Sequence, residues 1–121
     1  MSGNVWHYTL GGVPPSNNQF IGRTNFREYQ REKKSWAERI FFCCRPRPEK
    51  PLPRARVTLT YFFPDKRRRD PDNYAGKMLL DGLTAARILQ DDSFGNIELV
   101  LRARFGCKTA KTQIDIEELA A

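Results

Sequence analysis

The sequence predicts an α+β fold, a small mixed β-sheet with two helices whose elements follow the order β-α-β-α-β-β. Four segments place apolar residues at every second position, as half-buried strands do, and two repeat them every three or four positions, as amphipathic helices do. The chain has 121 residues, which is one domain by length. We therefore expect residues 1–121 to form a single domain.

The first half of the chain is expected to hold a strand, a helix and a stiff connector. Residues 5–10 place Trp6, Tyr8 and Leu10 on one face of a strand, and the glycine and proline pairs at 11–15 end it. Residues 25–44 predict the first helix. Four prolines between 46 and 53 end that helix. The apolar stripe of the helix comprises Phe26, Tyr29, Lys33, Trp36, Ile40 and Cys44.

The second half is expected to hold three strands and the second helix. Residues 56–63 form a strand, and Phe62 on its otherwise polar side predicts cover on both faces. Asp72 is expected to cap a helix over 73–86. Residues 97–105 alternate cleanly, and 112–116 suggest a last strand. The stripe of the second helix comprises Ala75, Leu79, Leu83 and Ala86.

The charge pattern favours a polyanionic partner. The net charge is +7, and residues 45–69 carry nine cations against two acids, which is the whole excess. A localised basic segment favours nucleic acid, although a solvated surface would look the same. The chain has no run near the ~18 apolar residues of a membrane helix, and residues 1–10 do not resemble a signal peptide. We expect a cytoplasmic protein without membrane contact.

The cysteines agree with a reducing compartment. Cys43, Cys44 and Cys107 are odd in number and two are adjacent, which does not suit a disulfide framework. With no CxxC pair and His7 as the single histidine, the sequence also argues against a zinc site. We expect three free thiols.

The segment that could do chemistry runs from Arg67 to Asp92. Asp70 and Asp72 flank Pro71, so both carboxylates can point the same way from an extended backbone. The Asp91–Asp92 pair follows the second helix, and we expect the two loops to lie at one end of the sheet if the flanking strands are neighbours. Three or four converging carboxylates would repel one another unless they held a cation such as Mg²⁺. Such an ion would act on a phosphodiester.

Plainer interpretations of the same residues remain open. Asp72 would serve only as a helix cap, and the Asp91–Asp92 pair would belong to a turn. Lys77 and Asp81, four residues apart, would form a surface ion pair. Lys77 would then not stabilise the negative charge that develops on a phosphate during cleavage. The arginine run would be a solvated loop.

The same segment resembles the RusA family of Holliday junction resolvases. The resemblance rests on Pro64 to Asn73 (PDKRRRDPDN), then Lys77, Asp81 and the run from Asp91 to Ser93. The run Pro14-Pro15-Ser16-Asn17-Asn18 resembles the family's N-terminal motif. The resemblance spans about residues 5–117, and the first helix and the proline connector match only in type.

The resemblance implies a homodimeric, Mg²⁺-dependent endodeoxyribonuclease that binds four-way DNA junctions and nicks two opposing strands, in DNA recombination and repair. Mn²⁺ would substitute for Mg²⁺, and the protein would be associated with the nucleoid. Many members of the family are carried by phages and prophages. Carried over by position, Asp70, Asp72 and Asp92 would be the metal ligands and Lys77 the catalytic lysine. From their charge alone, the cations of the basic run are expected to bind DNA phosphates: Lys66, Arg67, Arg68 and Arg69. The sequence leaves open which apolar face forms the dimer interface; the candidates are Trp36, Phe41, Phe42 and Phe62.

One departure and three rival functions accompany this prediction. Lys77 follows Asp72 by five residues, where the family's best-known pattern has four, and the extra residue falls around Gly76. One rival is a DNA-binding protein that does not cut, and another is a nuclease for flaps, forks or duplex. The third is an adaptor that binds partners through the proline-rich residues 46–53.

Overall fold

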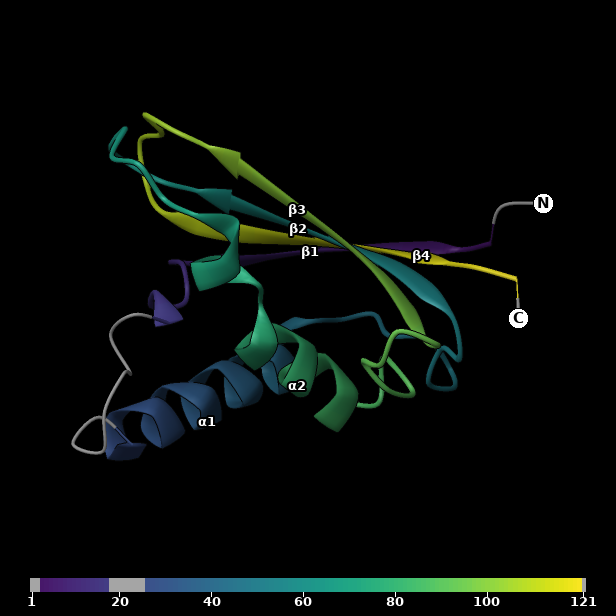
Figure 1. Ribbon diagram of the computed structural model, residues 1–121. Helices are drawn as coiled ribbons and strands as arrows, with labels where there is room; N and C mark the ends of the chain where they lie inside the picture. Colours follow the sequence, from purple (N-terminus) through teal and green to yellow (C-terminus); the bar gives the residue numbers. More distant parts are fainter. Residues whose placement is uncertain (1–2, 18–25, 121) are drawn as a thin grey trace.

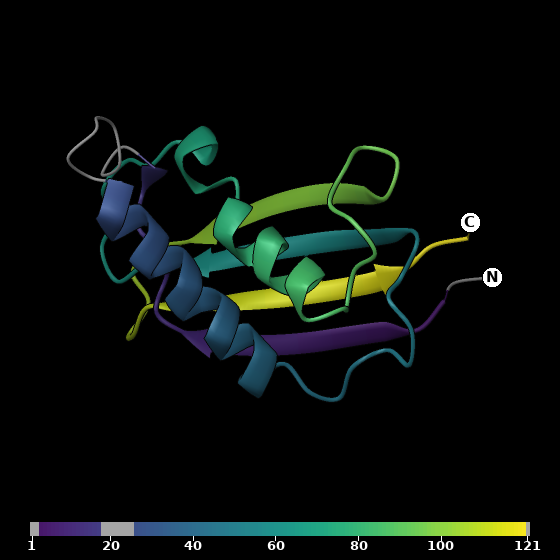
Figure 2. The same ribbon diagram turned by 90° about the horizontal axis from the view of Figure 1, so that it is seen from below.

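The chain folds into two layers, a twisted four-stranded sheet with both α-helices packed on one of its faces (Figure 1). This computed structural model describes residues 3–17 and 26–120. Within these described residues, the opposite face of the sheet carries no helix (Figures 1 and 2). The predicted α+β class with a mixed sheet and two helices is confirmed, and a short 3₁₀ helix adds one element to the expected order.

The sheet combines antiparallel and parallel pairing. Its strands are β1 (Val5–Gly11), β2 (Ala55–Phe62), β3 (Ile97–Arg104) and β4 (Lys111–Glu118), and their order is β1-β4-β2-β3. β4 is antiparallel to both of its neighbours, β1 and β2, whereas β2 and β3 are parallel. β3 is therefore an edge strand, joined to β2 by the crossover that contains the second helix.

The two α-helices, α1 (Phe26–Cys43) and α2 (Lys77–Ala85), pack against each other as well as on the sheet. From the predicted stripe of α1, Trp36, Ile40 and Cys44 are buried, but Phe26 is 63% exposed. The predicted first helical residue, Asn25, lies outside the described residues. In the described part of the chain, no helix combines the length and apolar character that crossing a membrane requires.

The second helix begins four residues later than the sequence pattern predicts. Residues 71–74 form a 3₁₀ helix, η3 (Pro71–Tyr74), and α2 starts only after Gly76, whose φ is +85°. Asp72 therefore lies inside η3 and does not cap α2, and Lys77 is the first residue of α2 instead of one turn into it. The break occurs because a left-handed residue cannot continue a right-handed helix. The break lies at Gly76, around which the spacing from Asp72 to Lys77 is one residue longer than in the best-known pattern of the RusA family.

The two faces of the sheet differ in cover. The side chains that β2 and β4 direct toward the helices are buried, as predicted for Val57, Leu59 and Ile114. Cover of β2 on both faces is wrong, since Phe62 is half-buried on the face that has no helix. On β3 the alternation is present but Leu99 stays 38% exposed, because α2 does not extend over this edge strand.

Candidate nucleic-acid interface

The loop after β2 is held together by one carboxylate. Asp65 accepts hydrogen bonds from Arg69 Nη1 at 2.9 Å and from the backbone N–H of Arg67 at 3.0 Å. These donors, led by the Arg69 side chain, lower the pKa of Asp65 from 3.8 to about 2. The Arg69 guanidinium also lies 4.1 Å from the ring centre of Phe63. Its side chain is only 12% exposed, so Arg69 orders the loop rather than facing solvent.

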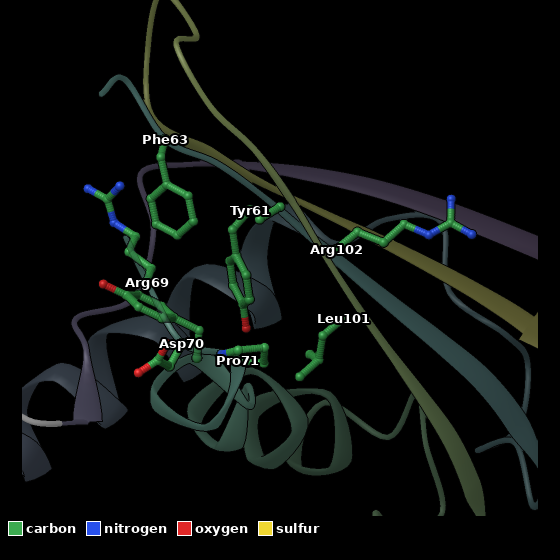
Figure 3. A pocket seen from close by; sticks show the side chains of 9 residues that line it. Tyr61, Phe63, Arg69, Asp70, Pro71, Leu101 and Arg102 are labelled. Atoms are coloured by element: carbon green, nitrogen blue, oxygen red, sulfur yellow. The ribbon is translucent and has the colours of Figure 1, made fainter. Parts of the chain in front are cut away.

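A small aromatic cavity of about 80 Å³ lies between this loop and β3 (Figure 3). Tyr61, Phe63 and Tyr74 form its inner wall, and their ring centres lie 5.3–6.2 Å apart. Burial raises the pKa of the Tyr61 phenol above its usual value. Asp70 lines the same cavity, but its carboxylate points away from the Tyr61 ring in Figure 3.

The first two predicted acids are close in sequence and exposed. Asp70 precedes η3 with an extended backbone, as the following proline predicts, and its Oδ1 is 3.3 Å from Arg68 Nε. Asp72 is in the first turn of η3, and its carbonyl oxygen accepts a hydrogen bond from Asn17 Nδ2 at 3.4 Å. Arg67 and Arg68 beside them are 80% and 89% exposed.

The predicted convergence of these acids with Asp91–Asp92 is wrong within one chain. β2 and β3 are parallel, so the crossover must leave one end of the sheet and return at the other. Asp70 and Asp72 precede α2 and Asp92 follows it, and α2 alone, with nine residues, is about 13 Å long. Figures 1 and 2 show η3 and the 87–96 loop at opposite ends of α2.

The Asp91–Asp92 pair belongs to a turn, as the plainer interpretation of these two residues predicts. The backbone N–H of Asp92 donates to Asp91 Oδ1 at 2.8 Å, and Ser93 Oγ donates to Asn96 Oδ1 at 2.6 Å. The backbone N–H of Asn96 donates to the carbonyl of Ser93 at 2.9 Å. These bonds close a compact loop before β3, in which Asp92 is half-buried and Asp91 is exposed.

Lys77 forms the ion pair that its spacing from Asp81 predicts. The Oδ2 atom of Asp81 lies 3.5 Å from Lys77 Nζ and 3.4 Å from Lys33 Nζ. The Asp81 carboxylate therefore links the start of α2 to α1. Lys77 is still 66% exposed, and its residue lines a small cavity together with Pro14, Pro15 and Asn17. The N-terminal motif thus meets the acidic segment in space, although Asn18 lies outside the described residues.

A single chain does not fit the three-carboxylate metal site that the resemblance implies. Across residues 3–17 and 26–120, no group of three histidine, cysteine or acidic side chains is placed to hold an ion. Asp70 and Asp72 can contribute two oxygens from one loop, whereas Asp92 is at the far end of the crossover.

The basic segment 45–69 does not form one surface, because β2 divides it. Residues 45–54 run along the end of the sheet where β2 begins, and residues 63–69 follow its other end (Figure 2). Arg47 is committed to structure, since it donates to the carbonyl oxygens of Phe41, Cys44 and Ala86 at the ends of the two helices. About 26 Å of strand separates the two halves.

A different set of cations completes the surface at the end of β2. The backbone N–H of Phe63 donates to the Arg104 carbonyl at 2.8 Å, and that of Cys107 donates to the Phe63 carbonyl at 3.0 Å. The turn after β3 is therefore attached to the basic loop. We call residues 62–72 and 102–111 together the basic end of the sheet; eight cations against three acids give it a net charge of +5. Its cations are Lys66, Arg67, Arg68, Arg69, Arg102, Arg104, Lys108 and Lys111.

The second half of this surface was not predicted from the sequence. Arg102, Arg104 and Lys111 were visible as the polar members of two alternating strands. Only the strand order, which places Arg104 and Lys111 on either side of Phe62, unites them with the loop.

Neither a protein-family model nor a curated protein matches this chain. The likeness to RusA resolvases therefore remains a resemblance of motifs.

Proposed function

We propose that this chain is a Mg²⁺-dependent, structure-specific endodeoxyribonuclease of the RusA kind, which resolves four-way DNA junctions as a homodimer during recombination and repair. The observation that carries the proposal is the basic end of the sheet. There, Asp70 and Asp72 stand exposed among cations that have the sign and density needed to hold a DNA backbone. Acids surrounded by phosphate-binding cations are suited to a metal shared with the scissile phosphate.

The proposal requires a second copy, because one chain keeps Asp92 away from the other acids. The free edge of β3 is a suitable contact, since Leu99 is 38% exposed and Phe94 in the preceding loop is fully exposed. Two β3 edges related by a two-fold axis would pair antiparallel. The start of one β3, with its Asp92, would then lie beside the end of the other, where Asp70 is found.

The apolar residues predicted for the dimer interface differ in how far they are exposed. Trp36 is buried in the core and is not available for an interface, which corrects the expectation for this residue. Phe41 and Phe42 on α1 are 45% and 70% exposed. They remain candidates for a different contact, and the β3 edge is preferred because it also completes the set of acids.

The test combines cleavage with complementation. Asp72→Asn and Asp92→Asn should each abolish Mg²⁺-dependent cutting of a synthetic four-way junction while junction binding in EDTA persists. After co-refolding in equal amounts, half of the dimers are mixed and each has one intact shared site. Nicking should therefore return to about one quarter of wild type, without paired cuts. No recovery would contradict the shared site, and normal cutting by Asp72→Asn would contradict the assignment of that residue.

A second candidate is a DNA-binding protein without nuclease activity. The observation that favours it is the separation of Asp92 from Asp70 and Asp72. It predicts that wild-type protein binds junctions equally with Mg²⁺ or EDTA and cuts with neither. A nuclease for flaps, forks or duplex would instead cut those substrates better than the junction in the same assay.

A further inference from the structure

The helix-free face of the sheet is an ordered grid of side chains, which we call the open face. The registers place every second residue of each strand on it, and neighbouring strands align these residues in rows. The two rows nearest the basic loop contain Lys111, Phe62 and Arg104, and then Gln113, Thr60 and Arg102.

The two halves of the open face carry opposite charge. The half nearest the basic loop holds three cations, Arg102, Arg104 and Lys111, and no acid. None of the three has a carboxylate partner among the residues that the structure describes. All three are exposed.

The far half is acidic and internally paired. Arg56 lies 3.1 Å from Glu98 and 2.8 Å from Glu117, and His7 Nδ1 lies 2.5 Å from Asp115 Oδ1. One arginine against three carboxylates leaves this half with a charge of −2 when His7 is neutral. A polyanion is therefore attracted to one half of the face and repelled by the other.

An aromatic ring lies between the unpaired cations. Phe62 is half-buried on the central strand β2, with Lys111 on one side and Arg104 on the other. Lys111 Nζ lies 4.6 Å from the ring centre, at the end of an exposed and flexible side chain that can move aside. Phosphate-binding cations around an accessible ring are the arrangement by which sheets hold unpaired bases.

We propose that the basic half of the open face binds single-stranded DNA, with Arg102, Arg104 and Lys111 contacting phosphates and Phe62 stacking on an unpaired base. The inference rests on the proposed function for the choice of DNA as the polyanion. A single strand is favoured over duplex because paired bases do not offer a face to the ring. Asp70 lies on the helix-covered side of the same end of the sheet, so a strand leaving its loop would pass around the end of β2 to reach the open face.

The test measures binding of a fluorescent oligo-dT by anisotropy in EDTA, between 50 and 200 mM salt. Each phosphate contact to a single strand contributes about 0.7 to the slope of log K against log salt, so Arg102→Gln with Arg104→Gln should reduce the slope by about 1.4. The matched control is Arg56→Gln, on the same face but already paired with Glu98 and Glu117, and it should leave the slope unchanged.

Stacking is tested separately. Phe62→Leu should weaken oligo-dT binding about 5- to 150-fold at constant salt slope, whereas Phe26→Leu, at an exposed phenylalanine of α1, should have no effect. Equal slopes for wild type and the double arginine variant would overturn the phosphate contacts, and wild-type affinity of Phe62→Leu would overturn the stacking. If wild type cuts junctions but does not bind oligo-dT, this inference alone is wrong. If it neither binds DNA nor cuts, the proposed function is wrong as well.

Discussion

Gly76→Ala is expected to destabilise the fold strongly, because Gly76 meets two separate demands. Its φ of +85° is costly for a residue with a side chain, by about 1–2 kcal/mol. A Cβ there would also overlap Leu59 Cδ1 and lie 3.2 Å from Tyr61 Oη, both in the core beneath η3. Overpacking of this kind costs about 1–3 kcal/mol, and a stiffer unfolded chain returns about 0.4–1 kcal/mol. We expect a net loss of about 2–4 kcal/mol.

Substitutions at two other glycines distinguish the cost of the left-handed backbone from the cost of overlap with Leu59. Gly12 has a φ of +80°, and a Cβ at this position would meet no atom of the described residues within 4 Å, so Gly12→Ala should cost about 1 kcal/mol from backbone strain alone. Gly95 has open space and no left-handed φ, so Gly95→Ala should change stability by less than about 0.5 kcal/mol.

The assay is denaturant unfolding followed by tryptophan fluorescence, from the buried Trp36 and the half-buried Trp6, with the free energy of unfolding taken from the midpoint and slope. If Gly76→Ala matches Gly12→Ala, the predicted overlap with Leu59 is refuted. If it matches Gly95→Ala, the whole account of the break between η3 and α2 fails.

Two further predictions concern protonation and thiol chemistry. Because the folded pKa of Asp65 is depressed to about 2, its bonds to Arg69 and Arg67 should be complete above its usual value of 3.8 and be lost as pH falls toward 2. Carboxyl NMR titration should show this low midpoint, and Arg69→Gln should move it back up; an unchanged midpoint in that variant would contradict the assignment. At pH 8 a thiol reagent should modify exposed Cys43 promptly but leave Cys44 intact until unfolding, since burial raises the pKa of Cys44 to about 11. Mass spectrometry over time distinguishes the two thiols, and equal rates would contradict the buried position.

Much of the fold could be predicted because its signals are local. Strand alternation correctly identified the buried faces of β1, β2 and β4, and the stripe of α1 correctly identified Trp36 and Ile40. Proline and glycine runs correctly marked the ends of β1 and α1. These patterns depend on which side of one element faces the core, and that information is contained within a dozen residues.

The site could be predicted only in part, because its assembly depends on topology. The extended backbone at Asp70 and the pairing of Lys77 with Asp81 follow from neighbouring residues. The position of Asp92 depends on whether β3 runs parallel or antiparallel to β2, which no local pattern states. The start of α2 at Lys77 depends on a single left-handed glycine, at which any side chain would meet Leu59 and Tyr61.

The insertion of β4 between β1 and β2 has a consequence for how the chain reaches its native state. Residues that face each other in the β1–β4 ladder are far apart in sequence; His7 and Asp115 are separated by 108 positions. Closing so long a loop is entropically costly, and contacts of this range slow folding. A nascent chain on the ribosome cannot complete its sheet until residues 111–118 emerge, so β1 and β2 must wait with the backbone edges that β4 later joins unpaired. Chains that end prematurely before this strand are expected to be substrates for chaperones and proteases.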